Sequence, residues 1–363
     1  MRPIRSNRRE WLLRLIAAAC ARSSQGAWRQ QKVPPLWRES PFSELSSLLT
    51  PTRQFFLRSH LSYPQLDLSG WELTVDGRVQ QPLKLNFAQL SQFNSETRRV
   101  TFECSGNPPG GGLISTADWR GTRLQAILER AGVLPGAQEI VFEGADFGID
   151  EAENIPLVYS RSIPLEKALA DETMVAWEMN GEALPWEHGF PARVIVPGYY
   201  AMSHVKWLTR IRVLDRPYRG FYMVKRYFTA RRVESTGEFE IRPELKMKLK
   251  SQIARPLHGE QIASESTIVT GAAWSGDGIV GRVEVSTDGG ASWVVAELMD
   301  KPQSYSWVRW RHRWTPAHNG AHTVVCRAFD DRGGTQPERA DPTVINRYGN
   351  NWYHRIDLMV RRG

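Results

Sequence analysis

The chain has 363 residues, of which 41% are hydrophobic and 24% are charged, and its formal net charge is +8. At roughly 150 residues per domain, this length predicts about two domains, each large enough to bury a core without disulfide bonds. The composition excludes a disordered chain and a small cysteine-rich scaffold. The net positive charge favours an anionic substrate or an acidic protein partner. We expect no nucleic acid, because the 47 basic residues are dispersed among 39 acidic ones.

The three cysteines, Cys20, Cys104 and Cys326, lie far apart and form no pair with zinc-ligand spacing. We therefore expect neither a disulfide framework nor a structural zinc site. The chain contains no run of about 18 apolar residues, so we predict no membrane span. Its 14 tryptophans and 13 phenylalanines favour a structure rich in β-strands.

The amino terminus carries an Arg8-Arg9 pair, followed by a short apolar stretch that ends in small residues. This pattern resembles a twin-arginine export signal and predicts a periplasmic protein. The alternative is a basic tail on a cytoplasmic protein. Lipidation of Cys20 is disfavoured, because Ala17 stands where a lipoprotein signal has a large aliphatic residue.

Residues 1–50 are interpreted as the export signal and a polar linker. Alternation of apolar residues from Trp71 around an Asp76-Gly77 turn predicts a hairpin. Helical spacing of apolar residues predicts helices over 86–93 and 124–131. We therefore expect a mixed α+β domain over residues 51–245.

The last part of the chain, residues 246–363, alternates apolar and polar residues between Gly, Asp and Pro turns. This cadence predicts an immunoglobulin-like β-sandwich, with Cys326 in its core as a small hydrophobe. Four tryptophans appear too many for such a core, which favours a two-fold homodimer with aromatic residues at the interface. The alternative is that strand alternation places most of them inside; they are Trp293, Trp307, Trp310 and Trp314.

Two segments carry residues suited to chemistry. Cys104 ends an apolar strand and precedes a Gly- and Pro-rich loop, and its thiolate would be a soft ligand for a transition metal. The alternative is a buried structural cysteine beside a tight turn. In the second segment, His188 and Arg193 flank a Gly-Phe-Pro turn and Lys206 follows the next turn, a set suited to a phosphate or another oxoanion. Taken singly, each is more often a solvated surface charge.

These segments resemble, in order, those of the sulfite oxidase family of molybdenum oxidoreductases. The resemblance covers the chain from about residue 50 to its end. It is carried by residues 56–60, 103–107, 114–124, 142–146, 162–165, 178–181, 187–193, 204–208 and 348–355.

The resemblance implies a molybdenum centre held by the ene-dithiolate of a pyranopterin (molybdopterin), with Cys104 as the only protein ligand to the metal. It also implies catalytic roles for Cys104, Arg58, Tyr227 and Arg355, and a dimerisation domain in the C-terminal part. The cofactor-binding residues that it implies are Phe56, Leu57, Arg58, Ser59, His60, Cys104, Asp146, His188, Arg193, Ser203, His204, Val205 and Lys206.

Departures from the family pattern concern the substrate. Pro108, Pro109 and Ser203 stand where sulfite-oxidising members carry arginines. The loss of guanidinium groups that could hold an oxoanion makes sulfite a doubtful substrate.

The sequence thus predicts an enzyme that exchanges an oxygen atom and two electrons with a small-molecule substrate. A Cys-x-x-Cys-His haem motif is absent from the sequence, so we expect an external electron carrier such as a c-type cytochrome. One alternative is a reductase of sulfoxides or other oxidised organic substrates. Another is a cofactor-free binding or assembly protein, which the presence of Cys104, His188, Arg193 and Lys206 disfavours.

Overall fold

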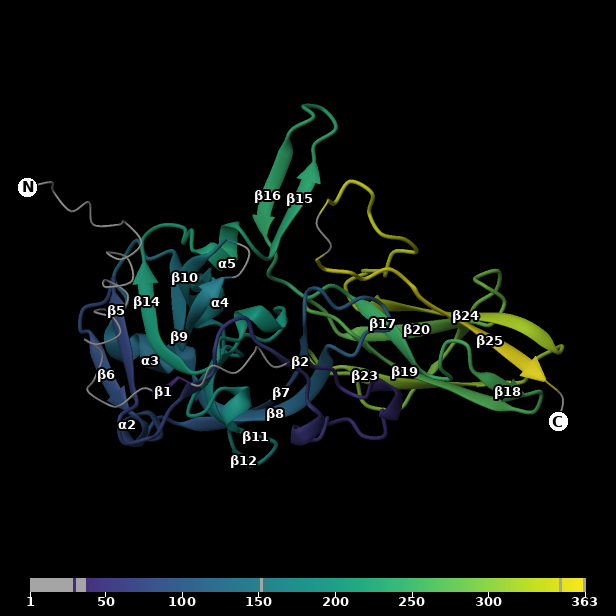
Figure 1. The fold of residues 1–363 in the computed structure, drawn as a ribbon, viewed down its shortest axis with the longest axis horizontal. Helices are drawn as coiled ribbons and strands as arrows, with labels where there is room; N and C mark the ends of the chain where they lie inside the picture. Colours follow the sequence, from purple (N-terminus) through teal and green to yellow (C-terminus); the bar gives the residue numbers. More distant parts are fainter. Residues whose placement is uncertain (1–28, 31–36, 151–152, 346–347, 362–363) are drawn as a thin grey trace, which may run out of the picture.

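The computed structural model describes residues 29–30, 37–150, 153–345 and 348–361. The expected export signal and Cys20 lie outside these ranges. The described chain consists mostly of strands with few helices, and it forms two bodies that lie side by side along the long axis (Figure 1). A two-stranded hairpin, β15–β16, projects from the junction between them.

The first body contains a five-stranded sheet in the order β10-β9-β14-β5-β6. Only β14 and β5 run parallel, with Ile211 paired to Val75, while the other neighbours are antiparallel. The strands of this sheet are β5 (Glu72–Gly77), β6 (Leu83–Asn86), β9 (Glu139–Asp150), β10 (Ile155–Pro164) and β14 (Leu208–Leu214).

A second sheet of the first body has the order β12-β11-β8-β7, with β13 also paired to β11. Its strands are β7 (Ser95–Glu103), β8 (Ile114–Arg123), β11 (Met174–Met179), β12 (Glu182–Ala183) and β13 (Arg193–Ile195). The helices are α2 (Phe87–Leu90), α3 (Leu124–Ala131), α4 (Leu165–Leu169), α5 (Phe221–Val224) and the short η1 (Phe42–Glu44), η2 (Thr52–Gln54), η3 (Trp186–His188) and η4 (Ala201–Ser203).

Both helices expected in this body are present. Asn86 caps α2 through a reciprocal pair of bonds with Gln89, each 2.9 Å long, and so limits the helix to residues after 86. Helix α3 buries Leu124 and Leu128 and ends at Gly132, whose φ of 69° is the left-handed conformation typical of a helix end.

The hairpin expected around Asp76 and Gly77 turns later than predicted. Both residues belong to β5, which pairs with β6 only after the connection over 78–82. Gly77 lies opposite Val213 of β14, and a Cβ on it would stand 2.2 Å from the Val213 carbonyl oxygen. The glycine therefore serves a close approach between parallel strands, not a two-residue turn.

Residues 37–50, expected to belong to a linker, pack against the body. Ser40 donates from its backbone nitrogen to the Gly112 oxygen at 2.8 Å and from its hydroxyl to the Ile114 oxygen at 2.7 Å. Three small strand pairs complete the first body: β1 (Arg29–Gln30) with β4 (Pro64–Gln65), β2 (Trp37–Arg38) with β3 (Leu57–Arg58), and β15 (Phe228–Arg232) with β16 (Phe239–Pro243).

The second body consists of two sheets around a common apolar core that includes Cys326, which is fully buried. One sheet has the order β17-β19-β23-β22, and its strands are β17 (Lys250–Arg255), β19 (Thr267–Trp274), β22 (Glu297–Leu298) and β23 (Val308–Trp314). The other has the order β18-β25-β24-β20-β21, with β18 (Gln261–Ala263), β20 (Val280–Ser286), β21 (Val294–Val295), β24 (Gly320–Asp330) and β25 (His354–Arg361).

The protein interior holds most of the tryptophans that the sequence suggested would be too many for the core of the second body. Trp307, Trp310 and Trp314 are buried. Alternation along β23 turns Trp310 and Trp314 into the core of the second body, whereas Trp307 precedes the strand and packs into the apolar cluster of the first body. Trp293 is half-buried and packs under the Arg327 guanidinium at 3.9 Å. The aromatic argument for a dimer interface is therefore wrong for three of the four residues.

The junction between the bodies is a continuous packed core. Trp274 and Trp307 of the second body belong to the same apolar cluster as the first body's five-stranded sheet. Thr101 of β7 bonds across the junction twice: its nitrogen donates to the Tyr305 oxygen at 2.8 Å, and its hydroxyl oxygen accepts from the Trp307 nitrogen at 2.7 Å. Strand β7, which leads directly to Cys104, is thus held by both bodies.

Candidate active site

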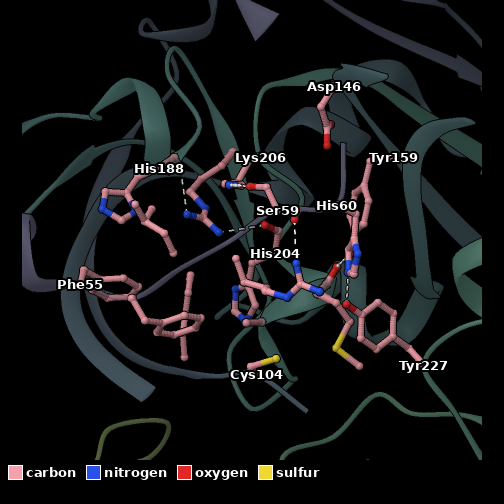
Figure 2. Close-up of a pocket in the computed structure, with 17 residues that line it drawn as sticks. Phe55, Ser59, His60, Cys104, Asp146, Tyr159, His188, His204, Lys206 and Tyr227 are labelled. Atoms are coloured by element: carbon pink, nitrogen blue, oxygen red, sulfur yellow. Dashed lines mark hydrogen bonds between the residues drawn. The ribbon is translucent and has the colours of Figure 1, made fainter. Parts of the chain in front are cut away.

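A cavity opens in the first body with an empty volume of about 680 Å³, including space that is open to solvent. Figure 2 shows its lining residues, which come from segments far apart in the sequence. They are Phe55, Phe56, Leu57, Arg58, Ser59, His60, Phe102, Cys104, Asp146, Tyr159, His188, Arg193, Ala201, Met202, His204, Lys206 and Tyr227.

Cys104 lies at one end of the cavity, at the first position after β7. Its nitrogen donates to the Leu113 oxygen at 3.0 Å, and its oxygen accepts from the Asn107 nitrogen at 2.8 Å, so the loop is closed on itself. Burial raises the pKa of the thiol, and Glu103 raises it further, whereas Arg58 and Lys250 lower it. A bound cation would favour the thiolate at this position.

Arg193 occupies the opposite region of the cavity and is held by backbone oxygens. Its guanidinium donates to the His188 oxygen at 2.8 Å and the His204 oxygen at 2.9 Å, and lies 4.9 Å from the ring centroids of Phe102 and Trp119. Burial lowers its pKa to about 9. The group therefore stays charged at neutral pH, at a fixed position.

Lys206 is the second cation of this region and is half-buried. Its ammonium group donates to the Ser59 hydroxyl at 2.5 Å and to the Glu187 oxygen at 3.2 Å, and lies 4.2 Å from the Trp207 ring centroid. Burial lowers its pKa and raises that of Asp146, which lines the same cavity. Among the described residues, neither Arg193 nor Lys206 forms a salt bridge.

Several buried polar atoms around these cations have no hydrogen-bond partner in the described part of the chain. Buried polar groups are almost always satisfied in folded proteins, so these atoms point to a ligand or to water. They are Asp146 Oδ1, His188 Nε2, Arg193 Nε and Ser203 Oγ. Arg193 Nε is an unpartnered donor beside the two cations, which fits a phosphorylated cofactor, and a single soft thiol at the other end fits a transition metal.

Tyr227 and His60 form a third region of the cavity. The Tyr227 hydroxyl is hydrogen-bonded to His60 Nε2 (Figure 2). Burial, together with the charge of Arg58, lowers the pKa of His60 to about 3, so the imidazole is neutral. Burial also raises the pKa of Tyr227 well above its usual value, so the phenol keeps its proton. Tyr227 itself has a φ of 50°, a conformation uncommon for a residue with a Cβ.

Arg161 supports Tyr227 and was not expected from the sequence. Its guanidinium donates to the backbone oxygens of Tyr222 and Glu244 and lies 5.7 Å from the Tyr227 ring centroid. The Glu244 nitrogen in turn donates to the Tyr227 oxygen at 2.7 Å. The one sequence signal for this role was an arginine in the middle of a strand whose neighbours are buried.

The structure brings most of the predicted site residues to this cavity. Those that line it are Phe56, Leu57, Arg58, Ser59, His60, Cys104, Asp146, His188, Arg193, His204, Lys206 and Tyr227. Ser203 and Val205 are buried next to lining residues but do not line the cavity themselves.

Arg355 does not reach the cavity. It lies on β25 in an exposed position and donates to the Gly289 oxygen at 2.9 Å and to Glu338 at 3.1 Å. The second body approaches the site through other residues. The Tyr348 ring centroid lies 5.2 Å from that of Tyr227, and His354 lies against Gly110. The expected contact of Arg355 with substrate is therefore not supported by this geometry.

Pro108 and Pro109 also lie outside the cavity lining. After Asn107 the loop turns toward the second body, where Gln252 Nε2 donates to the Gly111 oxygen at 2.9 Å. Arg58 is the third cation of the lining and lies over the exposed Trp37 at 5.3 Å.

Over the described ranges, no group of three or more His, Cys, Asp and Glu side chains is placed to hold a metal ion. Within the same ranges, no helix has the length and apolar character needed to cross a membrane. Cys104 and Cys326 are both free cysteines.

Comparisons with known proteins agree with this geometry. Residues 60–222 match the family model of an oxidoreductase molybdopterin-binding domain, and residues 242–361 match that of a Mo-co oxidoreductase dimerisation domain. The chain is 33% identical to the mitochondrial sulfite oxidase of Rattus norvegicus, over 93% of this chain and 65% of that protein. It is 35% identical to the sulfite oxidase of Gallus gallus, over 85% of this chain and 72% of that protein.

Two further relatives carry other activities in their names. The chain is 32% identical to a nitrate reductase [NAD(P)H] of Hordeum vulgare, over 90% of this chain and 41% of that protein. The solved structure of the sulfane dehydrogenase SoxCD from Paracoccus pantotrophus matches with a TM-score of 0.77 and 28% identity, over 90% of this chain and 86% of that one. The chain spans about two thirds or less of the length of the mammalian sulfite oxidases that it matches. These matches show that the chain belongs to the sulfite oxidase family of molybdenum oxidoreductases.

Proposed function

We propose that this protein is a molybdenum-dependent oxidoreductase that transfers an oxygen atom and two electrons to or from a small-molecule substrate. Family membership implies a molybdenum–pyranopterin cofactor. The observation that carries the proposal is the cavity itself, which has one half-buried cysteine at one end and two cations without salt-bridge partners at the other.

Each end of the cavity would hold a different part of the cofactor. Cys104 would ligate the metal, and Arg193 and Lys206 would bind the phosphate, with Ser59 and His188 as further polar contacts. The bound molybdenum supplies the oxygen-atom and two-electron chemistry. The protein's part is to place the reactive centre and to exclude water from it.

Tyr227, His60 and Arg58 face the region left for the substrate. In the tautomer of neutral His60 that carries its proton on Nε2, the imidazole donates to the Tyr227 oxygen, and the single proton of the phenol is then free to donate to a substrate oxygen. Arg58 can attract a negative charge and is held in place by stacking on Trp37. Such groups orient a substrate and stabilise charge that develops on its oxygen.

Replacement of the thiol is the direct test of the proposed metal ligand. Cys104→Ser should leave the fold and bound pterin in place but abolish turnover, because a neutral hydroxyl is a harder and weaker ligand. Metal analysis, pterin fluorescence after extraction and steady-state assay would measure this. Cys326→Ser, in the core of the second body, is the control and should keep activity. A Cys104→Ser protein with wild-type turnover would contradict the ligand assignment.

We further propose that the substrate is less anionic than sulfite, such as a neutral organic sulfur compound. Of the three cations in the cavity lining, the buried Arg193 and the half-buried Lys206 belong to the proposed phosphate region, which leaves Arg58. A small anion loses its hydration on entering the cavity, and one guanidinium offsets this cost less well than several. Names of relatives span sulfite, nitrate and sulfane chemistry, so family membership leaves the substrate open. Reduction of a sulfoxide is the alternative direction at the same site.

Sulfite turnover tests this substrate class. The resemblance implies that sulfite-oxidising members carry two arginines that this chain replaces by the Pro108-Pro109 pair and Ser203. If each of those arginines gives sulfite a charge-assisted hydrogen bond worth roughly 1.5 to 3 kcal/mol, kcat/KM for sulfite should be lower by roughly two to four orders of magnitude than that of the Gallus gallus enzyme. Both enzymes would be assayed with the same artificial electron acceptor. A micromolar KM with rapid turnover would show that other cations bind sulfite. Arg58→Gln should weaken sulfite capture further, whereas the exposed Arg53→Gln should not.

We propose that the second body is an immunoglobulin-like sandwich through which two copies of the chain form a homodimer. The matched dimerisation domain supports this, as do the exposed valines of edge strand β21, of which Val295 is 63% exposed. Sedimentation at micromolar protein concentration should show a dimer, and Val295→Asp on this face should weaken it. A wild-type monomer at that concentration would rule the dimer out.

We also propose export to the periplasm, with electrons exchanged there with a separate carrier such as a c-type cytochrome. The Arg8-Arg9 pair supports this. The twin-arginine route carries folded proteins, so a cofactor that was inserted in the cytoplasm would stay bound during export. Replacement of both arginines by lysine should retain the protein in the cytoplasm. Cell fractionation measures the distribution, and an unchanged distribution would leave the segment as a basic tail.

A further inference from the structure

A fully buried ion pair joins the two bodies at the residue next to Cys104. Glu103 ends β7 and Lys250 begins β17, and their side chains are 2% and 0% exposed. Lys250 Nζ lies 2.7 Å from Glu103 Oε1. The pair is separated by 147 positions in the chain, so no local pattern in the sequence predicts it.

The other hydrogen bonds of the pair are made with the cysteine loop and with the second body. Trp274 Nε1 donates to the other carboxylate oxygen of Glu103 at 2.9 Å, and Asn107 Nδ2 donates to Glu103 at 3.2 Å. Lys250 donates also to the Asn107 backbone oxygen at 2.9 Å. The pair therefore grips the cysteine loop, residues 104–107, at both of its ends.

Stability alone is a weak reason for such a pair. Removing two charges from water costs free energy that their mutual attraction often fails to recover, and apolar residues of similar size are frequently as stable or more so. The apolar cluster that includes Trp274 and Trp307 already joins the two bodies. A charged pair at this position thus calls for a role that apolar residues cannot fill.

We propose that Lys250 and Glu103 are positioning residues for the Cys104 ligand: they fix the loop that carries it and keep the electric field at the sulfur balanced. This rests on the proposed molybdenum function. Two opposite charges held at one site cancel at a distance, and loss of either leaves the other without compensation in a low-dielectric interior, where it acts on the sulfur while it stays ionised. The second body would then be part of the redox centre, in addition to any role in dimerisation.

The two charges should act on the metal in opposite directions. Reduction adds negative charge to the centre, so an uncompensated ammonium group favours the reduced form and an uncompensated carboxylate disfavours it. Glu103→Gln should therefore raise the reduction potential of the molybdenum, and Lys250→Gln should lower it. The double variant Glu103→Gln/Lys250→Gln, in which two amides can still bond to each other, should return toward the wild-type potential.

The experiment is a potentiometric titration of the purified, cofactor-loaded proteins, followed by the electron paramagnetic resonance signal of molybdenum. Arg309 and Asp300 provide a control, because they form a salt bridge of 2.8 Å and also join the two bodies, through the Ser46 oxygen at 2.7 Å, but neither lines the cavity. Arg309→Gln and Asp300→Asn should leave the potential unchanged.

Opposite shifts in the two single variants, absent from the control variants, would support the inference. Equal potentials, or shifts of the same sign, would overturn it and leave the pair as a structural contact. If Lys250→Gln does not fold, Glu103→Gln and the double variant test the inference. The reduction potential of Glu103→Gln must rise, and that of the double variant must not. A wild-type preparation without molybdenum would contradict the proposed function itself, whereas a titratable centre with the wrong signs would contradict only this inference.

Discussion

The site depends on one constraint. Two positive charges are held inside the cavity, and no carboxylate in contact with them neutralises them. Arg193 and Lys206 are held by backbone oxygens and a serine hydroxyl, with aromatic rings packed beside them. Backbone oxygens carry only partial charges, so they hold these groups in place without cancelling the field that they produce. A fold that keeps two such cations in its interior is prepared for an anionic ligand, and much of the first body's architecture provides their rigid support.

The second body completes that support. The cysteine loop is closed on one side by its own hydrogen bonds, and on the other by residues of β17 and of the segment before β25. Besides Lys250, Gln252 holds the Gly111 oxygen, and the Gly349 nitrogen donates to the Ser105 oxygen at 2.7 Å. A loop rich in glycine and proline has few side chains with which to fix itself, so its position is set by its neighbours. This explains why a domain matched as a dimerisation domain packs so closely on a cofactor-binding one.

The sequence predicted the residues of the site better than their surroundings. Cys104, His188, Arg193 and Lys206 stand in short segments whose residue types already indicate soft-metal and oxoanion chemistry, and the cavity lining contains all four. The sequence did not reveal Arg161 or the partner of Lys250, because contacts between residues 60 to 150 positions apart leave no local period. Arg355 was misplaced for the same reason. Its neighbours in the chain, Tyr348 and His354, approach the site, but alternation along β25 turns Arg355 to the opposite face.

The part of the cavity that would bind the cofactor and the part that would select the substrate differ in their charged groups. Near the cations, burial favours neutral forms of the surrounding groups, as the lowered pKa values of His60 and His188, both about 3, indicate. These imidazoles therefore add polar contacts without adding charge, and under the proposed function Arg58, half-buried beside an exposed tryptophan, is the cation that would meet the substrate. One polar oxygen satisfies a single guanidinium, so such a site would not require a fully charged substrate. Because Arg193 and Lys206 would bind the cofactor and Arg58 the substrate, the proposed substrate end can vary while the cofactor end stays unchanged.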